Sequence, residues 1–234
     1  MKVSGNEIEI NFRKAALGAE IPLGLAEDFG RIGYWLAARR VNPLPAGLTA
    51  LDAFDVENSG AGTLLESEQE WNLTPKAGQG LSALYAGASA CDLLCVQYSA
   101  LRLRQVDAPL LVLVAAALAA AEHALMLQVE LLAADGTTAV ACCDSGMVRA
   151  QAAVLQRFTA AAALDMRLQR ASSEHSSNKP VALPAAPPDD IFSEGADVDE
   201  AEWSRVQQYA TRMLVPASET SRAGAGAGEL DSGT

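Results

Sequence analysis

Two arginines, a glutamate and several hydroxyl groups gather in the segment Arg212–Arg222, which reads RMLVPASETSR. Guanidinium groups bind carboxylates and phosphates through charge-assisted hydrogen bonds. Such a segment, fixed by Pro216 just after a helix, could fold over a cleft and hold an anionic ligand. We predict a ligand site that this segment shares with the second helix, formed by Arg212, Ser218, Glu219, Ser221, Arg222 and Glu27. The alternative is a polar C-terminal tail that follows the end of a helix.

A second group of ionisable residues lies on a predicted helix over residues 23–40. Glu27, Asp28 and Arg31 fall within about one helical turn, and Arg31 follows Glu27 by four residues. At that spacing an acidic and a basic side chain pair on the helix surface. We therefore expect a Glu27–Arg31 pair, with an active-site carboxylate as the alternative.

Asp92 falls near the apolar stripe of a predicted helix over residues 80–95. A buried carboxylate needs a charged or hydrogen-bonding partner. Arg102 and Arg104 follow on a predicted strand, and either could supply that partner. This favours a structural ion pair over a functional carboxylate.

The cysteines and His123 show little sign of a reactive site. Cys142 and Cys143 are neighbours on a predicted strand, where adjacent side chains point to opposite faces, so these two could hardly share a metal ion. With Cys91 and Cys95, they are expected to act as small buried hydrophobic residues. His123 ends a helix, where it interacts favourably with the helix dipole. The alternative for His123 is a general base in a pocket. No metal site is predicted, and no motif indicates a catalytic residue or a cofactor.

The charge balance excludes several classes of partner. The chain has 234 residues, of which 50% are hydrophobic, and a formal net charge of −12. Nucleic acids and anionic membrane surfaces need clustered Lys and Arg, and no such run occurs. The N-terminal segment becomes polar too early for a signal peptide. We therefore expect a cytoplasmic protein whose cysteines are reduced.

The centre of the chain must position these residues. Leu110–Ala121 is apolar on every side, which predicts a buried core helix with Asp107 as its cap. The run is shorter than the ~20 residues that a membrane span requires. Alternation from Leu125 to Leu131 predicts a strand, and Asp135-Gly136 predicts a two-residue type I′ turn. The paired strand would present Thr138, Val140 and Cys142.

Periodicity predicts further helices over residues 6–17, 46–54 and 147–162, and strands over residues 101–104 and 164–169. The polar stretch over residues 55–79 is expected to be a loop with room for one strand. Asp197 and Glu200 resemble a capping box that opens a last helix, which runs to about Leu214. The docking stripe of this helix is Trp203, Val206, Ala210 and Met213.

These elements predict an α+β fold, in which helices from both chain ends pack around a small, mostly antiparallel sheet with a buried Ala-rich helix. In this prediction, residues 1–171 form the main globular domain. Residues 172–196 form a flexible linker or long loop, and residues 197–216 form a C-terminal helix that docks back on the main domain. Residues 217–234 are a Gly/Ala-rich tail.

The two ends of the chain resemble a bacterial family described as domain of unknown function 3726. The opening resembles it through Asn6-Glu7-Ile8-Glu9, Lys14-Ala15-Ala16, Gly18, Gly24–Asp28 and Trp35-Leu36, and the ending through Val215–Glu219, Ser221-Arg222 and Gly224–Gly226. The middle of the chain matches only in general character. The chain departs at Leu23, where the family tends to carry Trp, and at Leu17, where it tends to carry Arg. The resemblance implies no activity and no catalytic residue.

Two functions remain open from the sequence. The first is a protein of small-molecule metabolism, which binds or transforms a small anionic metabolite. The second is a non-catalytic scaffold or subunit, with another copy of the chain or a different protein as its partner. The lack of a nucleophile–base pattern fits the second, whereas the polar segment after the last helix fits the first.

Overall fold

The computed structural model describes residues 1–67, 70–133, 136, 138–160, 163–171, 181–182 and 195–213. Its helices are α1 (Gly5–Gly18), α2 (Leu23–Ala38), α3 (Leu44–Asp55), α4 (Ala83–Val96), α5 (Pro109–Glu122), α6 (Ala152–Ala160) and α8 (Glu200–Thr211). Its strands are β1 (Lys2–Val3), β2 (Ser59–Gly60), β3 (Thr63–Glu66), β4 (Trp71–Thr74), β5 (Gly80–Leu81), β6 (Ala100–Val106), β7 (Met126–Leu132), β8 (Thr138–Asp144), β9 (Met147–Ala150), β10 (Leu164–Arg170), β11 (Val181–Ala182) and β12 (Ala196–Asp197).

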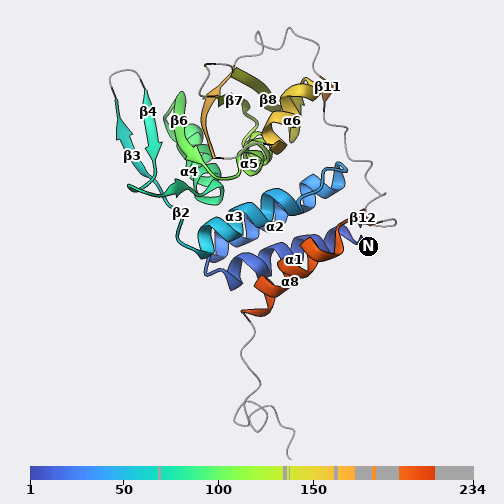
Figure 1. Cartoon of the computed structure of the whole chain (residues 1–234). Helices are drawn as coiled ribbons and strands as arrows, with labels where there is room; N and C mark the ends of the chain where they lie inside the picture. Colours follow the sequence, from blue (N-terminus) through green and yellow to red (C-terminus); the bar gives the residue numbers. More distant parts are fainter. Residues whose placement is uncertain are drawn as a thin grey trace, which may run out of the picture.

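The predicted α+β fold is confirmed, and the sheet is larger than expected. Ten strands form one sheet with the path β11-β9-β8-β7-β10-β6-β4-β3, while β2 and β5 pair beside β6. Most pairings are antiparallel, but β4 and β5 both run parallel to β6. Helices α1, α2, α3 and α8 lie together beside this sheet (Figure 1).

Helix α5 is the centre of the core. Leu110 to Val114 are buried, as the apolar run predicts, and the helix packs against β7, β8 and β9 as well as α2, α4 and α6. The prediction of burial on every side is wrong for one stripe, because Ala115, Leu118 and Ala119 are partly exposed. No helix in the described part of the chain is long and apolar enough to cross a membrane.

Helices α4, α5 and α6 pack on one face of the sheet. We call the opposite side the outer face; it carries the half-exposed side chains of β6, β7 and β10 and the exposed Val140 of β8. Each of these strands alternates between buried and more exposed residues, as expected where only one face meets the core.

The first helix of the chain packs against the last described one, and α1 lies between α2 and α8 (Figure 1). Ser4 and Glu7 form a capping box at the start of α1. Helix α8 buries Trp203, Val206 and Ala210, which confirms most of its docking stripe. Met213 is 42% exposed, because α8 ends at Thr211.

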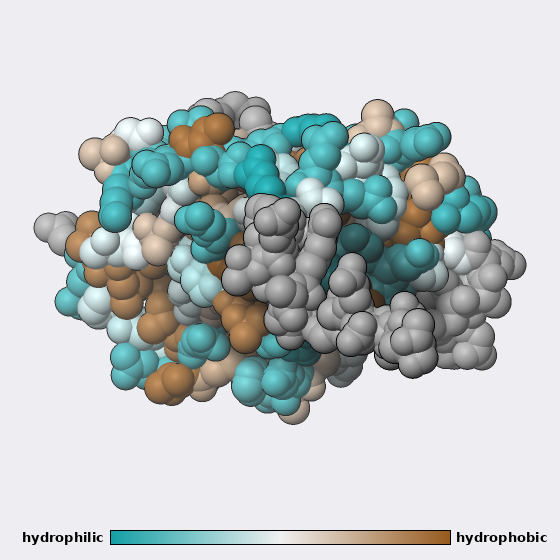
Figure 2. Space-filling view, turned by 90° about the horizontal axis from the view of Figure 1, so that it is seen from below, coloured by the Kyte–Doolittle hydropathy of each residue, from teal (hydrophilic) through white to brown (hydrophobic). Residues whose placement is uncertain are grey.

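Seen from the side of α1 and α8, the described surface is mostly hydrophilic, with separate apolar patches (Figure 2).

Helix α2 is joined to the sheet by polar contacts: the indole nitrogen of Trp35 and the guanidinium of Arg39 both donate to the carbonyl oxygen of Gly146, at 3.1 and 3.2 Å. Arg39 also stacks on the Trp35 ring, and burial lowers the pKa of its guanidinium. These bonds fix α2 against the turn between β8 and β9.

Several predicted elements need correction. The stretch over residues 55–79 contains the hairpin of β3 and β4 as well as β2, because its polar residues lie at the edge of the sheet rather than in a loop. Residues 147–150 are strand β9 rather than the start of a helix. Helix α8 is capped by Asp199, which accepts from the N–H of Glu202, and Asp197 instead pairs with Lys2 in the small sheet of β1 and β12.

The β7–β8 hairpin exists, but its register differs from the prediction. The last paired residues are Leu132 and Thr138, whereas a two-residue turn at Asp135-Gly136 would place Leu132 opposite Ala139. Asp135 itself lies outside the described residues. A change of one residue in register moves every side chain to the opposite face. Leu127 therefore lies opposite Cys143 in the core. The predicted face of Thr138, Val140 and Cys142 belongs to the outer face.

Asp107 caps a different helix from the one predicted. The N-cap of α5 is Ala108, without a side-chain bond, whereas the Oδ1 of Asp107 accepts from the N–H of Ala83 at the start of α4, at 2.9 Å. The pairing of Leu81 with Val106 brings these residues together. Asp107 is buried, its Oδ2 has no hydrogen-bond partner among the described residues, and burial raises its pKa to about 6.

The raised pKa of Asp107 predicts a pH-dependent stability. Between about pH 4 and pH 6 the folded protein holds a proton that the unfolded chain releases, so this residue's contribution to stability falls as the pH rises through that window. Asp107→Asn keeps the acceptor for Ala83 but does not titrate. The stability of this variant relative to the parent should therefore rise by up to about 3 kcal/mol across the window, measured by urea unfolding. A difference that does not change with pH would contradict a raised pKa.

Two glycines provide a matched test of how α8 docks. A Cβ at Gly18, the last residue of α1, would lie 1.9 Å from the backbone oxygen of Tyr209, whereas a Cβ at Gly24 would meet nothing within 4 Å. Gly18→Ala should lower the free energy of unfolding by about 1–3 kcal/mol, because backbone must move. Gly24→Ala should raise it by up to about 1 kcal/mol. Chemical denaturation of both variants tests this, and equal effects would contradict the packing.

Candidate functional site

Three arginines of neighbouring strands gather on the outer face of the sheet. Arg102 and Arg104 come from β6, and Arg167 comes from β10, where it lies directly opposite Arg102. Like charges in opposite positions of a sheet repel each other. Carboxylates must therefore lie between them, and Glu70 and Asp165 supply these. We call the five residues the arginine cluster.

Asp165 holds two of the arginines and the backbone at once. Its Oδ2 lies 3.1 Å from Arg102 and 3.2 Å from Arg104, and its Oδ1 accepts from the N–H of Gln105 at 3.0 Å. The register of β10 and β6 shifts between Leu164 and Met166. Gln105, opposite this irregularity, has a φ of +54°, and its otherwise unpaired N–H turns toward the carboxylate.

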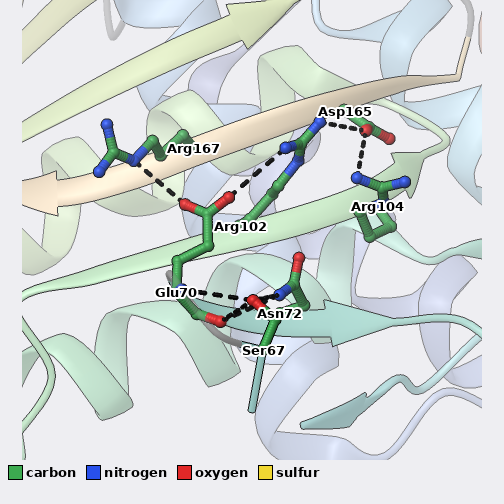
Figure 3. Close-up of polar contacts among 7 residues, drawn as sticks. All are labelled: Ser67, Glu70, Asn72, Arg102, Arg104, Asp165 and Arg167. Atoms are coloured by element: carbon green, nitrogen blue, oxygen red, sulfur yellow. Dashed lines mark hydrogen bonds and ion pairs between the residues drawn. The ribbon is translucent and has the colours of Figure 1, made fainter. Parts of the chain in front are cut away.

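Glu70 bridges the like-charged pair. Its two carboxylate oxygens lie 3.4 Å from Arg102 and 3.4 Å from Arg167, and Figure 3 shows the carboxylate between these two side chains. The β3–β4 hairpin holds Glu70 in place. The hydroxyl of Ser67 donates to the carbonyl oxygen of Glu70 at 2.6 Å and accepts from Asn72 at 3.1 Å.

The cluster turns its positive groups outward. The side chains of Glu70 and Asp165 are 20% exposed, whereas those of Arg102, Arg104 and Arg167 are 32–43% exposed. The Nε atoms of Arg102 and Arg167 are buried, and the Nε of Arg167 is the atom that lies 3.4 Å from Glu70. Three guanidiniums against two carboxylates leave one excess positive charge, in a chain whose net charge is −12.

An open groove of about 680 Å³ lies beside the cluster. Arg102, Arg104 and Asp165 form one wall, and the loop with Lys76 and Gly78 forms another. Lys76 adds a second positive charge. The groove can therefore attract a small anion and offer it several N–H donors. The described residues hold no group of His, Cys, Asp and Glu that could bind a metal ion.

The structure describes two of the six predicted site residues, Arg212 and Glu27. Arg212 forms an ion pair with Asp55 and stacks on Tyr209, 4.3 Å from the ring centre. The bond to Asp55 raises the pKa of Arg212. Arg212 lines a groove of about 760 Å³ that also contains Leu17. Glu27 is exposed on α2 and does not line this groove. Ser218, Glu219, Ser221 and Arg222 lie outside the described residues.

Two predicted ion pairs are wrong. Arg31 pairs with Asp28 and with Glu122 of α5, at 3.5 Å each, rather than with Glu27. Helix α2 turns Glu27 to solvent, while Asp28 lies next to α5. Asp92 is exposed at the edge of α4 and pairs with neither Arg102 nor Arg104, because those arginines project from the outer face, away from the helices.

His123 and the cysteines are distributed between core and surface. His123 is exposed and forms the C-cap of α5, where its backbone N–H donates to the carbonyl oxygen of Ala119 at 2.9 Å. Cys91 and Cys143 are buried, as expected, but Cys95 and Cys142 are only half-buried. Burial raises the pKa of the Cys91 thiol to about 12, so this thiol is unreactive near neutral pH.

Sequence reasoning did not identify the arginine cluster as a site. The alternation of Arg102 and Arg104 on one predicted strand, and of Asp165 and Arg167 on another, placed each pair on a polar face. The sequence therefore placed three arginines on the polar faces of two strands, which was the one available signal of this cluster. The contribution of Glu70 had no such signal, because it depends on a hairpin that the polar stretch over residues 55–79 concealed.

Comparisons with known proteins give a fold but no family. The chain matches no protein-family model and no curated protein, so the resemblance to domain of unknown function 3726 stays a prediction. It is similar to the solved structure of a dehydrogenase from Sinorhizobium meliloti, with a TM-score of 0.58 and 11% identity over 90% of this chain and 99% of that one. A malate dehydrogenase from Entamoeba histolytica gives a TM-score of 0.53 and 8% identity over 93% of this chain and 99% of that one. At these identities the likeness shows the fold alone.

Asp165 should be essential for the order of the arginine cluster. Asp165→Ala removes the acceptor of the Gln105 N–H and of two guanidiniums, so we expect the free energy of unfolding to fall by about 1–3 kcal/mol. Asp165→Asn keeps an acceptor for the backbone and should cost less. Glu66→Ala, at an exposed position of β3, is the control. Urea unfolding measures all three, and an unchanged Asp165→Ala variant would contradict the structural role.

Proposed function

We propose that this protein binds a small anionic metabolite in the groove beside the arginine cluster. The observation that carries the proposal is the arrangement of charge: two carboxylates lie deeper and hold three guanidiniums that are more exposed. The carboxylates fix the arginines in place before a ligand arrives, which lowers the entropy lost on binding. The exposed parts of the guanidiniums remain open to an anion.

The chemistry of guanidinium favours a carboxylate or phosphate ligand. Its planar array of donors matches the paired oxygens of these groups. Arg102 and Arg104 both line the groove, and Lys76 lies on the other wall. An anion between them would contact cations from two sides. A dicarboxylate is a fitting candidate, since Arg104 and Lys76 lie on different walls of the groove and could each bind one carboxylate.

The segment after α8 is a weaker place for the same function. Arg212 is already neutralised by Asp55 and covered by Tyr209 on one side. An anion there would have to compete with the carboxylate of Asp55. Arg104 shares the single carboxylate of Asp165 with Arg102, so its positive charge is balanced less completely than that of Arg212.

A specific observation also favours the second function, a subunit of a larger assembly. The outer face of the sheet carries Val140, which is 40% exposed, close to the charged side chains of β7 and β10. A subunit interface combines an apolar core with a polar rim, and an exposed apolar residue among polar ones could form part of such a surface. Light scattering would decide, because a monomer at all concentrations would exclude a stable assembly of identical chains. For either function we propose a cytoplasmic location, which the four free cysteines support.

Substitutions at the two arginine positions discriminate between the sites. We expect L-malate or inorganic phosphate to bind, and Arg104→Gln to weaken binding about tenfold, because charge-assisted hydrogen bonds are lost. Arg212→Gln should leave the affinity unchanged. Isothermal titration calorimetry measures the affinities, which should fall with added salt.

The same titrations can also contradict the proposed anion site. Loss of affinity in Arg212→Gln alone would place the anion at the end of α8. No binding of either anion at millimolar concentrations would remove the support for an anion site on the sheet. Circular dichroism of both variants checks that they are folded.

A further inference from the structure

A narrow pocket lies between α2, α4 and α5, on the opposite side of the sheet from the arginine cluster. Its volume is about 140 Å³. It opens along the partly exposed stripe of α5 formed by Ala115, Leu118 and Ala119, which the sequence predicted to be buried. Small or apolar side chains form its inner walls, among them Leu25, Leu84, Ala88 and Ala119.

The pocket exists because small residues line the contact between α4 and α5. Gly87 and Ala115 approach so closely that a Cβ on Gly87 would lie 2.9 Å from the Cβ of Ala115. Beside this contact, Ala88 and Ala119 leave the space between the helices unfilled. An apolar group can enter such a space and gain burial at no cost in polar contacts.

The mouth of the pocket is acidic. Asp28 of α2, Asp92 of α4 and Glu122 of α5 all line it, together with Arg31 and His123. Arg31 lies 3.5 Å from both Asp28 and Glu122, so one cation is shared by two carboxylates. Burial is the main cause that raises the pKa of Asp28, and the nearby carboxylates Glu122 and Asp92 raise it further.

Asp92 has no cationic partner among the described residues. Among the charged groups acting on Asp28, Arg31 lowers its pKa, whereas Glu122, Asp92 and the neighbouring Glu27 raise it. Three carboxylates against one guanidinium leave the mouth negative when His123 is neutral. A positive group placed between Asp28 and Asp92 would relieve this repulsion.

We propose that this pocket binds a small aliphatic amine in its protonated form. The hydrocarbon chain lies against the small side chains between α4 and α5, and the ammonium group lies at the mouth beside Asp92 and Asp28. This site is separate from the proposed anion site and opposite to it in charge. A carboxylate ligand is disfavoured here, because it would meet the same carboxylates that leave the mouth negative.

Three probes with the same chain and different head groups test the proposal: pentylamine, 1-pentanol and pentanoate. We expect the protein to bind pentylamine more tightly than pentanol, and pentanoate least. Protein NMR would show the largest amide shifts at the pocket residues of α4 and α5. Selection of pentanoate over pentylamine, or binding of none of the three, would overturn the proposal.

Three variants test the roles of mouth and wall. Asp92→Asn should weaken pentylamine binding about tenfold, because a charge-assisted contact is lost, and leave pentanol unchanged. Glu66→Gln removes an exposed carboxylate of β3 that does not line the pocket, so it should change neither. Ala119→Leu fills the pocket and should abolish binding of both probes.

These results are independent of the anion site. Arg104→Gln should not alter pentylamine binding, so failure at one site does not imply failure at the other. An Asp92→Asn variant that binds pentylamine as tightly as the parent would overturn the placement of the ammonium group. Unchanged binding by a folded Ala119→Leu variant would overturn the placement of the chain.

Discussion

The burial of α5 is the constraint on which the rest of the structure depends. Leu110 to Val114 have no polar side chain to present to water, so neighbours are needed on nearly every side of the first turns of this helix. The sheet covers one side, and α2, α4 and α6 cover others. The alanines that follow allow these helices to approach closely. They also leave the stripe of Ala115, Leu118 and Ala119 only partly covered, and the pocket between α2, α4 and α5 lies along it.

The same constraint separates the charges of the molecule. Since α4, α5 and α6 occupy one face of the sheet, polar residues of the strands can project only from the other. Arg102, Arg104 and Arg167 are therefore gathered on the outer face, where Glu70 and Asp165 keep them from repelling each other. The carboxylates of α2, α4 and α5 gather at the mouth of the helical pocket. An acidic chain thus presents one local site of positive charge and one of negative charge, on opposite sides of the core.

The caps at the N-termini of α1 and α4 show that both local and distant contacts can stabilise the start of a helix. Ser4 and Glu7 cap α1 through residues three apart, which any reader of the sequence can recognise. Asp107 caps α4 across 24 residues, and it can do so only because β5 lies beside β6. The cost of that arrangement is a buried carboxylate with one unpaired oxygen.

The sequence by itself determined the fold class, the core helix, the first and last helices, and the alternation of β6, β7 and β10. These features depend on local periodicity and composition, which act over a few residues. Only the tertiary structure decided the register of the β7–β8 hairpin, the helix that Asp107 caps and the partners of the arginines. A shift of one residue in the pairing of β7 and β8 reverses the faces of β8, and no local pattern reveals that shift. Glu70 meets Arg102 because β4 lies parallel to β6, a pairing between segments far apart in the chain. Such contacts depend on which surfaces must be buried together, and that is settled by the packing of the whole domain.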